Sequence, residues 1–207
     1  ADTFEPGIMT PEMVGHKRRI VLGKHAGKHA VQKSLEDAGI QTTDEQLDEI
    51  VRRIKAIADK GKRICDADLH AVASDVLGRN LGSETIKLKE LSVMTSNLTT
   101  PTAVVRAIVG DEEAVASNIG TGPVDAAVKA VQQMIAGYTK VKIRDFRIEA
   151  ITGGADALAE VTIGVEDEDG RMVTAHAAST DIVTASVDAL VTAINILLDK
   201  KKLWNMQ

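Results

Sequence analysis

The residues best suited to hold a small ligand form a glycine-containing turn, Asn118-Ile119-Gly120-Thr121-Gly122-Pro123. Pro123 suits the first position of a helix, where its missing N–H costs nothing. Glycines let the backbone approach a ligand, and the free N–H groups of a helix start attract a carboxylate or another small anion. A tight strand-to-helix turn without a ligand would use the same glycines. For this turn taken alone, that purely structural interpretation is the preferred one.

A second turn, Ala178-Ser179-Thr180-Asp181, precedes a later helix in the same way. Its Ser, Thr or Asp side chain would cap that helix, and capping alone explains these residue types. The two turns nevertheless occupy corresponding positions in two similar halves of the chain. If the two helices pack side by side, both turns open at one edge and could form one pocket.

Other polar residues give weaker signals. His25 and His29 are four residues apart, but Gly27 between them favours a turn over a metal site. Cys65 is the single cysteine, so it forms no internal disulfide, and its neighbours have no metal-ligand spacing. We expect Asp66 and Asp68 to cap a helix, and His176 to be a hydrogen-bonded histidine within a strand.

Catalytic signatures are missing from the sequence. It has no Ser or Cys nucleophile motif, no phosphate-binding P-loop and no clustered metal-ligand motif. We therefore predict no catalytic residue, no metal ligand and no cofactor within this chain.

The composition of the chain restricts the kinds of partner it is expected to bind. Twenty-five basic and 30 acidic residues give a net charge of −5 without long runs of one sign, which argues against nucleic acid. No apolar run is expected to reach the roughly 18 residues of a membrane span, and no signal pattern is present at the start. With one cysteine, the chain is expected to be cytoplasmic.

The spacing of apolar residues predicts the helices and strands that position the two turns. Thr43 and Gln46 form a potential capping box before a helix whose apolar residues share one face, and a second short helix starts near Asp66 or Asp68 and ends at Gly78. The glycine-rich, polar segment 78–83 reads as a linker, after which the pattern becomes that of strands.

An internal duplication follows the linker. Each half reads strand, strand, strand, helix; Ile86–Thr95, Thr102–Val109 and Ala114–Asn118 are the expected strands of the first half, and Asp169-Gly170 is a hairpin signal in the second. The segment 123–131 aligns with 182–190, and each helix carries an apolar stripe that a sheet must cover. The predicted fold class is α+β, with a small helical linker region followed by a duplicated βββα domain whose helices pack on antiparallel sheet.

Five segments in order resemble the region beyond the catalytic barrel of 2-isopropylmalate synthase and (R)-citramalate synthase. They are 8–15 (IMTPEMVG), 22–30 (LGKHAGKHA), 120–126 (GTGPVDA), 156–161 (DALAEV) and 179–186 (STDIVTAS). The resemblance implies linker subdomains at 1–39 and 40–82 and a regulatory, dimer-forming domain at 83–207. It also implies a homodimeric parent whose (β/α)₈ barrel holds a divalent metal and condenses acetyl-CoA with a 2-oxo acid.

In this family the regulatory domain binds the end-product amino acid, which causes feedback inhibition. Carried over by position, the expected effector-binding residues are Asn118, Gly120, Gly122, Pro123, Val124, Ala126, Ser179, Asp181, Ile182 and Ala185. The leading prediction is leucine as effector, with 2-oxoisovalerate as the substrate of the parent enzyme, and isoleucine with pyruvate is the alternative. A structural dimerisation module with a degenerate effector site is a further alternative. Activity of the chain by itself is not expected.

Overall fold

The computed structural model describes residues 27–59, 64–78, 84–151 and 157–204. The first matched segment at 8–15, most of the second at 22–30, the remainder of the linker at 79–83 and the start of the segment at 156–161 lie outside these ranges.

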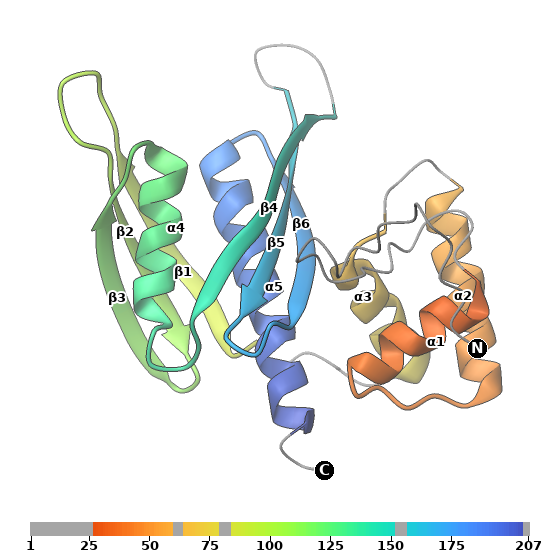
Figure 1. Ribbon diagram of the computed structural model, residues 1–207. Helices are drawn as coiled ribbons and strands as arrows, with labels where there is room; N and C mark the ends of the chain where they lie inside the picture. Colours follow the sequence, from red (N-terminus) through yellow and green to blue (C-terminus); the bar gives the residue numbers. More distant parts are fainter. Residues whose placement is uncertain (1–26, 60–63, 79–83, 152–156, 205–207) are drawn as a thin grey trace, which may run out of the picture.

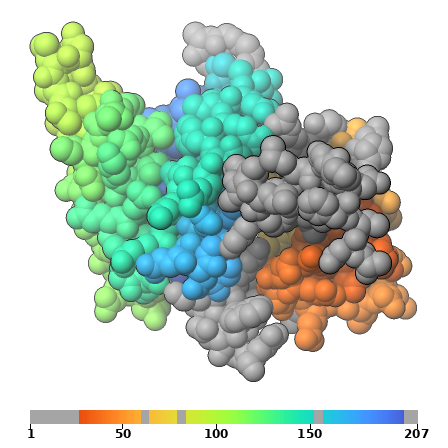
Figure 2. Space-filling view, in the orientation of Figure 1, coloured from red at the N-terminus to blue at the C-terminus, as the bar shows by residue number. Residues whose placement is uncertain are grey.

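Three helices form a small unit with its own core, to one side of the rest of the chain (Figure 1, Figure 2). They are α1 (Lys28–Asp37), α2 (Asp44–Ala58) and α3 (Asp66–Leu77). The predicted capping box is confirmed: the Gln46 N–H donates to Thr43 Oγ1 at 3.3 Å, and the Thr43 N–H donates to Gln46 Oε1 at 3.0 Å. The second predicted helix is also confirmed, since α3 ends at Gly78 in the left-handed conformation that glycine favours. Apolar side chains of all three helices share one buried cluster.

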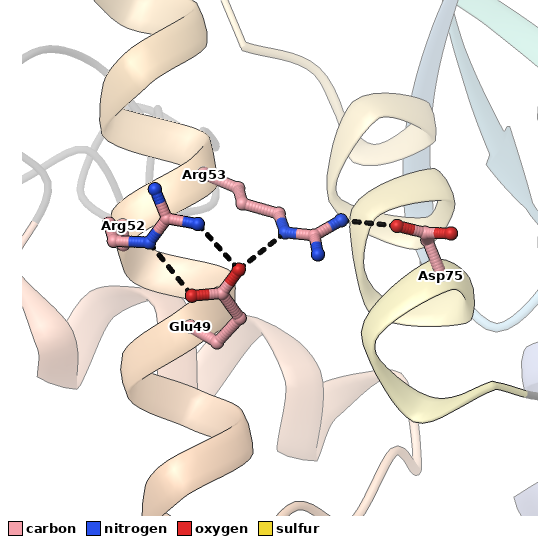
Figure 3. Close-up of polar contacts among 4 residues, drawn as sticks. All are labelled: Glu49, Arg52, Arg53 and Asp75. Carbon is pink, nitrogen blue, oxygen red and sulfur yellow. Dashed lines mark hydrogen bonds and ion pairs between the residues drawn. The ribbon is translucent and has the colours of Figure 1, made fainter.

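Charged side chains join α2 to α3 at the surface of this unit (Figure 3). Glu49 accepts hydrogen bonds from both Arg52 and Arg53, and Arg53 also pairs with Asp75 of α3. These guanidinium groups lower the pKa of the Glu49 carboxyl to about 2. Only the Arg53–Asp75 pair connects the two helices, and because all three pairs are partly exposed they contribute little to stability.

The rest of the chain is two βββα halves, as predicted. The first half contains β1 (Ile86–Met94), β2 (Thr102–Val109), β3 (Glu112–Ile119) and α4 (Pro123–Met134); the second contains β4 (Val141–Ala150), β5 (Ala159–Asp167), β6 (Met172–Ser179) and α5 (Ile182–Trp204). Each half forms an antiparallel three-stranded sheet in sequence order. The second hairpin turns at Gly170, which has φ 74°, and the first turns at Gly110, which has φ 65°.

Both halves carry a β-bulge at the same place in their first strand. The register shifts between Leu88 and Glu90 in β1 and between Ile143 and Asp145 in β4. A bulge inserts one residue and so reverses the alternation of faces beyond it. Apolar residues with the spacing 2, 3, 2 therefore fall on one face: Ile86, Leu88, Leu91 and Val93 in β1, and Val141, Ile143, Phe146 and Ile148 in β4.

The two halves share a single core. Helix α4 packs on β2 and β3, α5 packs on β5 and β6, and the two helices contact each other with both N-termini at the same end of the domain (Figure 1). Helix α5 also reaches β1, where Asn195 bonds both the N–H and the C=O of Ile86.

Burial on several sides explains the apolar character of α5. By length and composition, 182–199 would pass as a membrane span, with a mean hydropathy of 1.7. However, 67% of this window is buried inside the domain, which is the environment of a core helix. The single apolar stripe predicted for α5 is therefore only part of its buried surface, because Ala185, Ala189, Ala193 and Ile196 are buried as well.

Candidate functional site

The start of α4 is shaped by Gly120. A Cβ atom on this residue would lie 2.3 Å from the Ala126 nitrogen and 2.8 Å from the Ala126 Cα. Both atoms belong to the helix backbone and cannot turn aside. Gly120 is therefore required for the first turn of α4 to lie against the end of β3, where the Gly120 N–H donates to the Pro101 carbonyl at 3.0 Å.

Gly122 has a different environment. It is the N-cap of α4 in extended conformation, and a Cβ atom built on it would meet nothing within 4 Å. No side chain caps the helix there, so the N–H groups of Val124 and Asp125 in the first turn keep their donor capacity. Open space and backbone hydrogen-bond donors therefore occur together at Gly122.

Asp125 orders the turn from the other side. Its carboxylate accepts hydrogen bonds from the Thr121 N–H at 2.8 Å and from Lys129 Nζ at 2.8 Å. Lys129 and the Thr121 N–H lower the pKa of the Asp125 carboxyl. The turn is therefore held in one shape by its own helix.

An apolar cavity of about 390 Å³ opens beside this turn. Its volume is at the lower end of the roughly 300–1,000 Å³ typical of small-molecule sites, and it is a shallow, open depression rather than an enclosed pocket. The lining comes from the α4 turn and from β4, which belongs to the other half: Thr121, Gly122, Pro123, Val124, Asp125, Val128, Ile143 and Phe146.

The bulge in β4 places Phe146 in this lining. Phe146 pairs with Ile163, whose side chain is fully buried on the helix side of the sheet. In a strand without a bulge, residues three apart such as Ile143 and Phe146 would face opposite sides of the sheet. Its side chain is still 37% exposed, so it forms an open wall of the cavity.

The second turn is closed by its own side chains. Asp181 Oδ1 accepts the Val183 N–H at 2.8 Å, and Asp181 Oδ2 accepts the Thr184 hydroxyl at 2.9 Å. Ser179 Oγ accepts the Asp181 N–H at 3.1 Å. Asp181 therefore caps α5, in agreement with the capping interpretation of this turn.

The structure divides the ten predicted effector residues. Gly122, Pro123 and Val124 line the cavity. Asn118 instead donates to Gln133 of α4 at 3.1 Å and so ties β3 to the helix. Ala126 and Ala185 are fully buried at equivalent places in the first turns of α4 and α5.

Five lining residues were not predicted: Thr121, Asp125, Val128, Ile143 and Phe146. Thr121, Asp125 and Val128 belong to the turn and helix already singled out. Ile143 and Phe146 come from β4, which belongs to the other half of the domain. Their signal in the sequence was the apolar spacing 2, 3, 2 that β4 shares with β1. A pocket formed jointly by both turns stays a prediction.

Comparison with known families divides the chain near residue 63. The model of the LeuA allosteric (dimerisation) domain matches residues 63–198. The model described as homocitrate synthase post-HMGL domain-like matches residues 1–62.

Curated relatives match nearly the whole chain. A probable 2-isopropylmalate synthase of Methanosarcina mazei is 64% identical over 97% of this chain and 39% of its own length, and one of Methanosarcina acetivorans is 63% identical over 98% and 39%. A putative (R)-citramalate synthase of Methanothermobacter thermautotrophicus is 41% identical over 98% of this chain and 40% of its own length. The chain thus spans about two fifths of the length of these relatives.

Proposed function

This chain belongs to the LeuA allosteric (dimerisation) domain family, and we propose that it is the regulatory part of a 2-isopropylmalate synthase that binds leucine at the start of α4. The observation that carries the proposal is the meeting of an apolar cavity with an uncapped helix start at Gly122. The higher identity to 2-isopropylmalate synthases than to the citramalate synthase favours leucine over isoleucine.

An aliphatic amino acid matches the chemistry of this cavity. Its branched side chain would contact Val124, Val128 and Phe146, where burying apolar surface contributes about 25 cal/mol per Å². Its carboxylate would accept hydrogen bonds from the N–H groups in the first turn of α4. The helix dipole makes this end of the helix attractive to an anion. Its ammonium group would lie near the carboxylate of Asp125 at the rim.

The second part of the proposal is a homodimer. Apolar side chains on the outer face of the first sheet, Val104 of β2 and Val115 and Ile119 of β3, are exposed. They share this face with Arg106, which pairs with Glu90 and Glu113. A face with both apolar and charged side chains suits contact with another protein surface. A second copy of the chain fits the description of the matched family.

Catalysis is assigned to another part of the parent enzyme. The condensation of acetyl-CoA with 2-oxoisovalerate, and the divalent metal that it requires, would belong to a barrel outside this chain. Leucine would then inhibit by favouring one of two states of the whole enzyme. Incubating the chain with both substrates should release no thiol above a blank without protein.

Titration calorimetry tests the effector site. Leucine should release or absorb heat at one site per chain, isoleucine should bind more weakly, and leucinamide, which lacks the carboxylate, should bind at least tenfold more weakly than leucine. Equal binding of leucinamide would refute the role of the helix start. No binding of either amino acid would favour a structural module with a degenerate site.

Sedimentation tests the dimer separately. The wild-type chain should sediment as a dimer, and Val115→Lys should shift it toward a monomer because it places a charge on the outer sheet face. Lys142→Glu, an exposed charge change on β4, is the matched control. A wild-type monomer would contradict this part of the proposal whatever the calorimetry gives.

A further inference from the structure

Three side chains capable of binding a metal meet where α3 lies against the edge strand β6. Cys65 Sγ is 3.3 Å from His176 Nδ1, and His176 Nε2 is 3.5 Å from Asp68 Oδ1. One ligand atom from each residue can be chosen so that all three lie within 4.8 Å of one another. Cys65 and Asp68 come from the start of α3, whereas His176 is more than 100 residues further along the chain.

The spacing fits a small divalent cation. Zinc binds Cys sulfur at about 2.3 Å, His nitrogen at about 2.0–2.1 Å and carboxylate oxygen at about 2.0–2.2 Å, with tetrahedral geometry. Ligand atoms on such an ion are separated by roughly 3.3–3.6 Å. The Cys65 and Asp68 contacts use different nitrogens of His176, so binding one ion requires the imidazole ring or the Asp68 carboxylate to turn until one nitrogen and both other ligands face the ion.

Neighbouring contacts hold the ligands in place. Asp68 Oδ2 accepts the Cys65 N–H at 2.9 Å, which fixes the carboxylate and directs its other oxygen toward His176. Beside the cluster, Asp66 Oδ2 accepts the N–H of Thr174 at 2.8 Å and its hydroxyl at 2.7 Å. Such supporting hydrogen bonds orient ligands in metal sites.

The cluster is closed to bulk solvent but not sealed. The Asp68 side chain is 12% exposed and that of His176 is 16% exposed, so both ligands are in contact with solvent. Cys65 is buried.

The state of the thiol argues against a nucleophile. Burial, and then the charge of Asp68, raise the pKa of Cys65 to about 12, so the sulfur is protonated at neutral pH. A Cys–His–Asp catalytic arrangement needs a thiolate. A divalent cation reverses this preference because it displaces the thiol proton and offsets the negative charge.

We propose that Cys65, Asp68 and His176 form a tetrahedral site for a zinc-class divalent cation, completed by water, that fastens α3 to β6. The ion joins the helical unit to the regulatory sheet. Its role is to fix the relative position of these two parts.

Cobalt(II) is the probe because it occupies zinc sites and reports on sulfur ligation. Cys65 is the only cysteine of the chain, so a thiolate-to-cobalt charge-transfer band can arise only from this site. We expect one cobalt per chain, the charge-transfer band, and loss of the band when zinc is added. Cys65→Ser and His176→Ala should abolish it, whereas the exposed His29→Ala should retain it.

Thermal unfolding of the wild-type chain gives a test that needs no variant to fold. Zinc at about 100 times its Kd should raise Tm by about 5 °C, and a chelator should reverse the shift. The proposal is overturned if the wild-type chain retains no cobalt after gel filtration and zinc leaves Tm unchanged. A band that survives Cys65→Ser would equally exclude this site.

Discussion

The two βββα halves have the same topology, the same bulge and the same left-handed hairpin glycine, yet they treat their helix starts in opposite ways. The start of α5 is capped by Asp181, whereas the corresponding residue of α4 is Gly122, which leaves the start open. At the other corresponding pair, Gly120 allows close packing where the second half has Ser179. The duplicated fold is therefore common to both halves, and the candidate site lies where they differ.

The first strands of the two halves, β1 and β4, also differ in how well the rest of the domain covers them. Leu91 of β1 packs against the core, whereas its counterpart in β4, Phe146, is 37% exposed and lines the cavity. Helix α5 is 23 residues long and clamps β1 through Asn195, while α4 is 12 residues long and ends before the equivalent position. Helix α4 also holds the start of β4, because Gln132 Nε2 donates to the Val141 carbonyl at 3.0 Å. The cavity lies beside the other end of α4, at residues 121–128.

The largest effect is expected from Gly120→Val. The new Cβ would collide with the backbone of Ala126, so the free energy of unfolding should fall by about 3 kcal/mol or more. Urea unfolding followed by circular dichroism measures it. Ser179→Val, which places the same side chain at the equivalent position of the second half and removes one hydrogen bond, should cost about 1 kcal/mol. Equal losses would remove the distinction between the two turns.

Gly122→Asp copies the cap of α5 onto α4. The new carboxylate should accept the first-turn N–H groups and repel the carboxylate of leucine, weakening binding roughly 30-fold, or about 2 kcal/mol. Stability should change by only a few tenths of a kcal/mol. Calorimetry beside a urea titration separates the two quantities, and Gly122→Ala is the control. Undiminished leucine binding would show that the helix start is not used.

Phe146→Ala should mainly weaken leucine binding, whereas Leu91→Ala should mainly lower stability. Removing the partly exposed Phe146 should weaken leucine binding about tenfold, or about 1.4 kcal/mol. Removing Leu91, its counterpart in the packed half, should instead lower the free energy of unfolding by about 2 kcal/mol. Binding and unfolding are measured on both variants. If both lose only stability, the cavity is not a ligand site.

The smallest effect is expected from Asp181→Ala. It removes the cap of α5 and should lower the free energy of unfolding by about 1 kcal/mol, as for other N-caps. Leucine binding should be unchanged, because Asp181 does not line the cavity. A selective loss of leucine affinity would instead support one pocket shared by both turns.

Local patterns were sufficient for most of the fold. The Thr43 capping box, the end of α3 at Gly78, the Gly170 hairpin and the duplicated βββα order all depend on residues near one another in the sequence. Such features are set by backbone preference and by apolar periodicity, which can be read directly. The turn at Gly122 was found in the same way.

Tertiary structure decided which features share a site. Only the packed chain brings Phe146 beside Val124 and His176 beside Cys65, because these pairs come from different elements and leave no spacing in the sequence. It also showed that the two glycines have different roles. A side chain at Gly120 would collide with the backbone of α4, whereas a side chain at Gly122 would meet open space. The sequence by itself determined the elements and their capping; their packing determined the cavity and the Cys–His–Asp cluster.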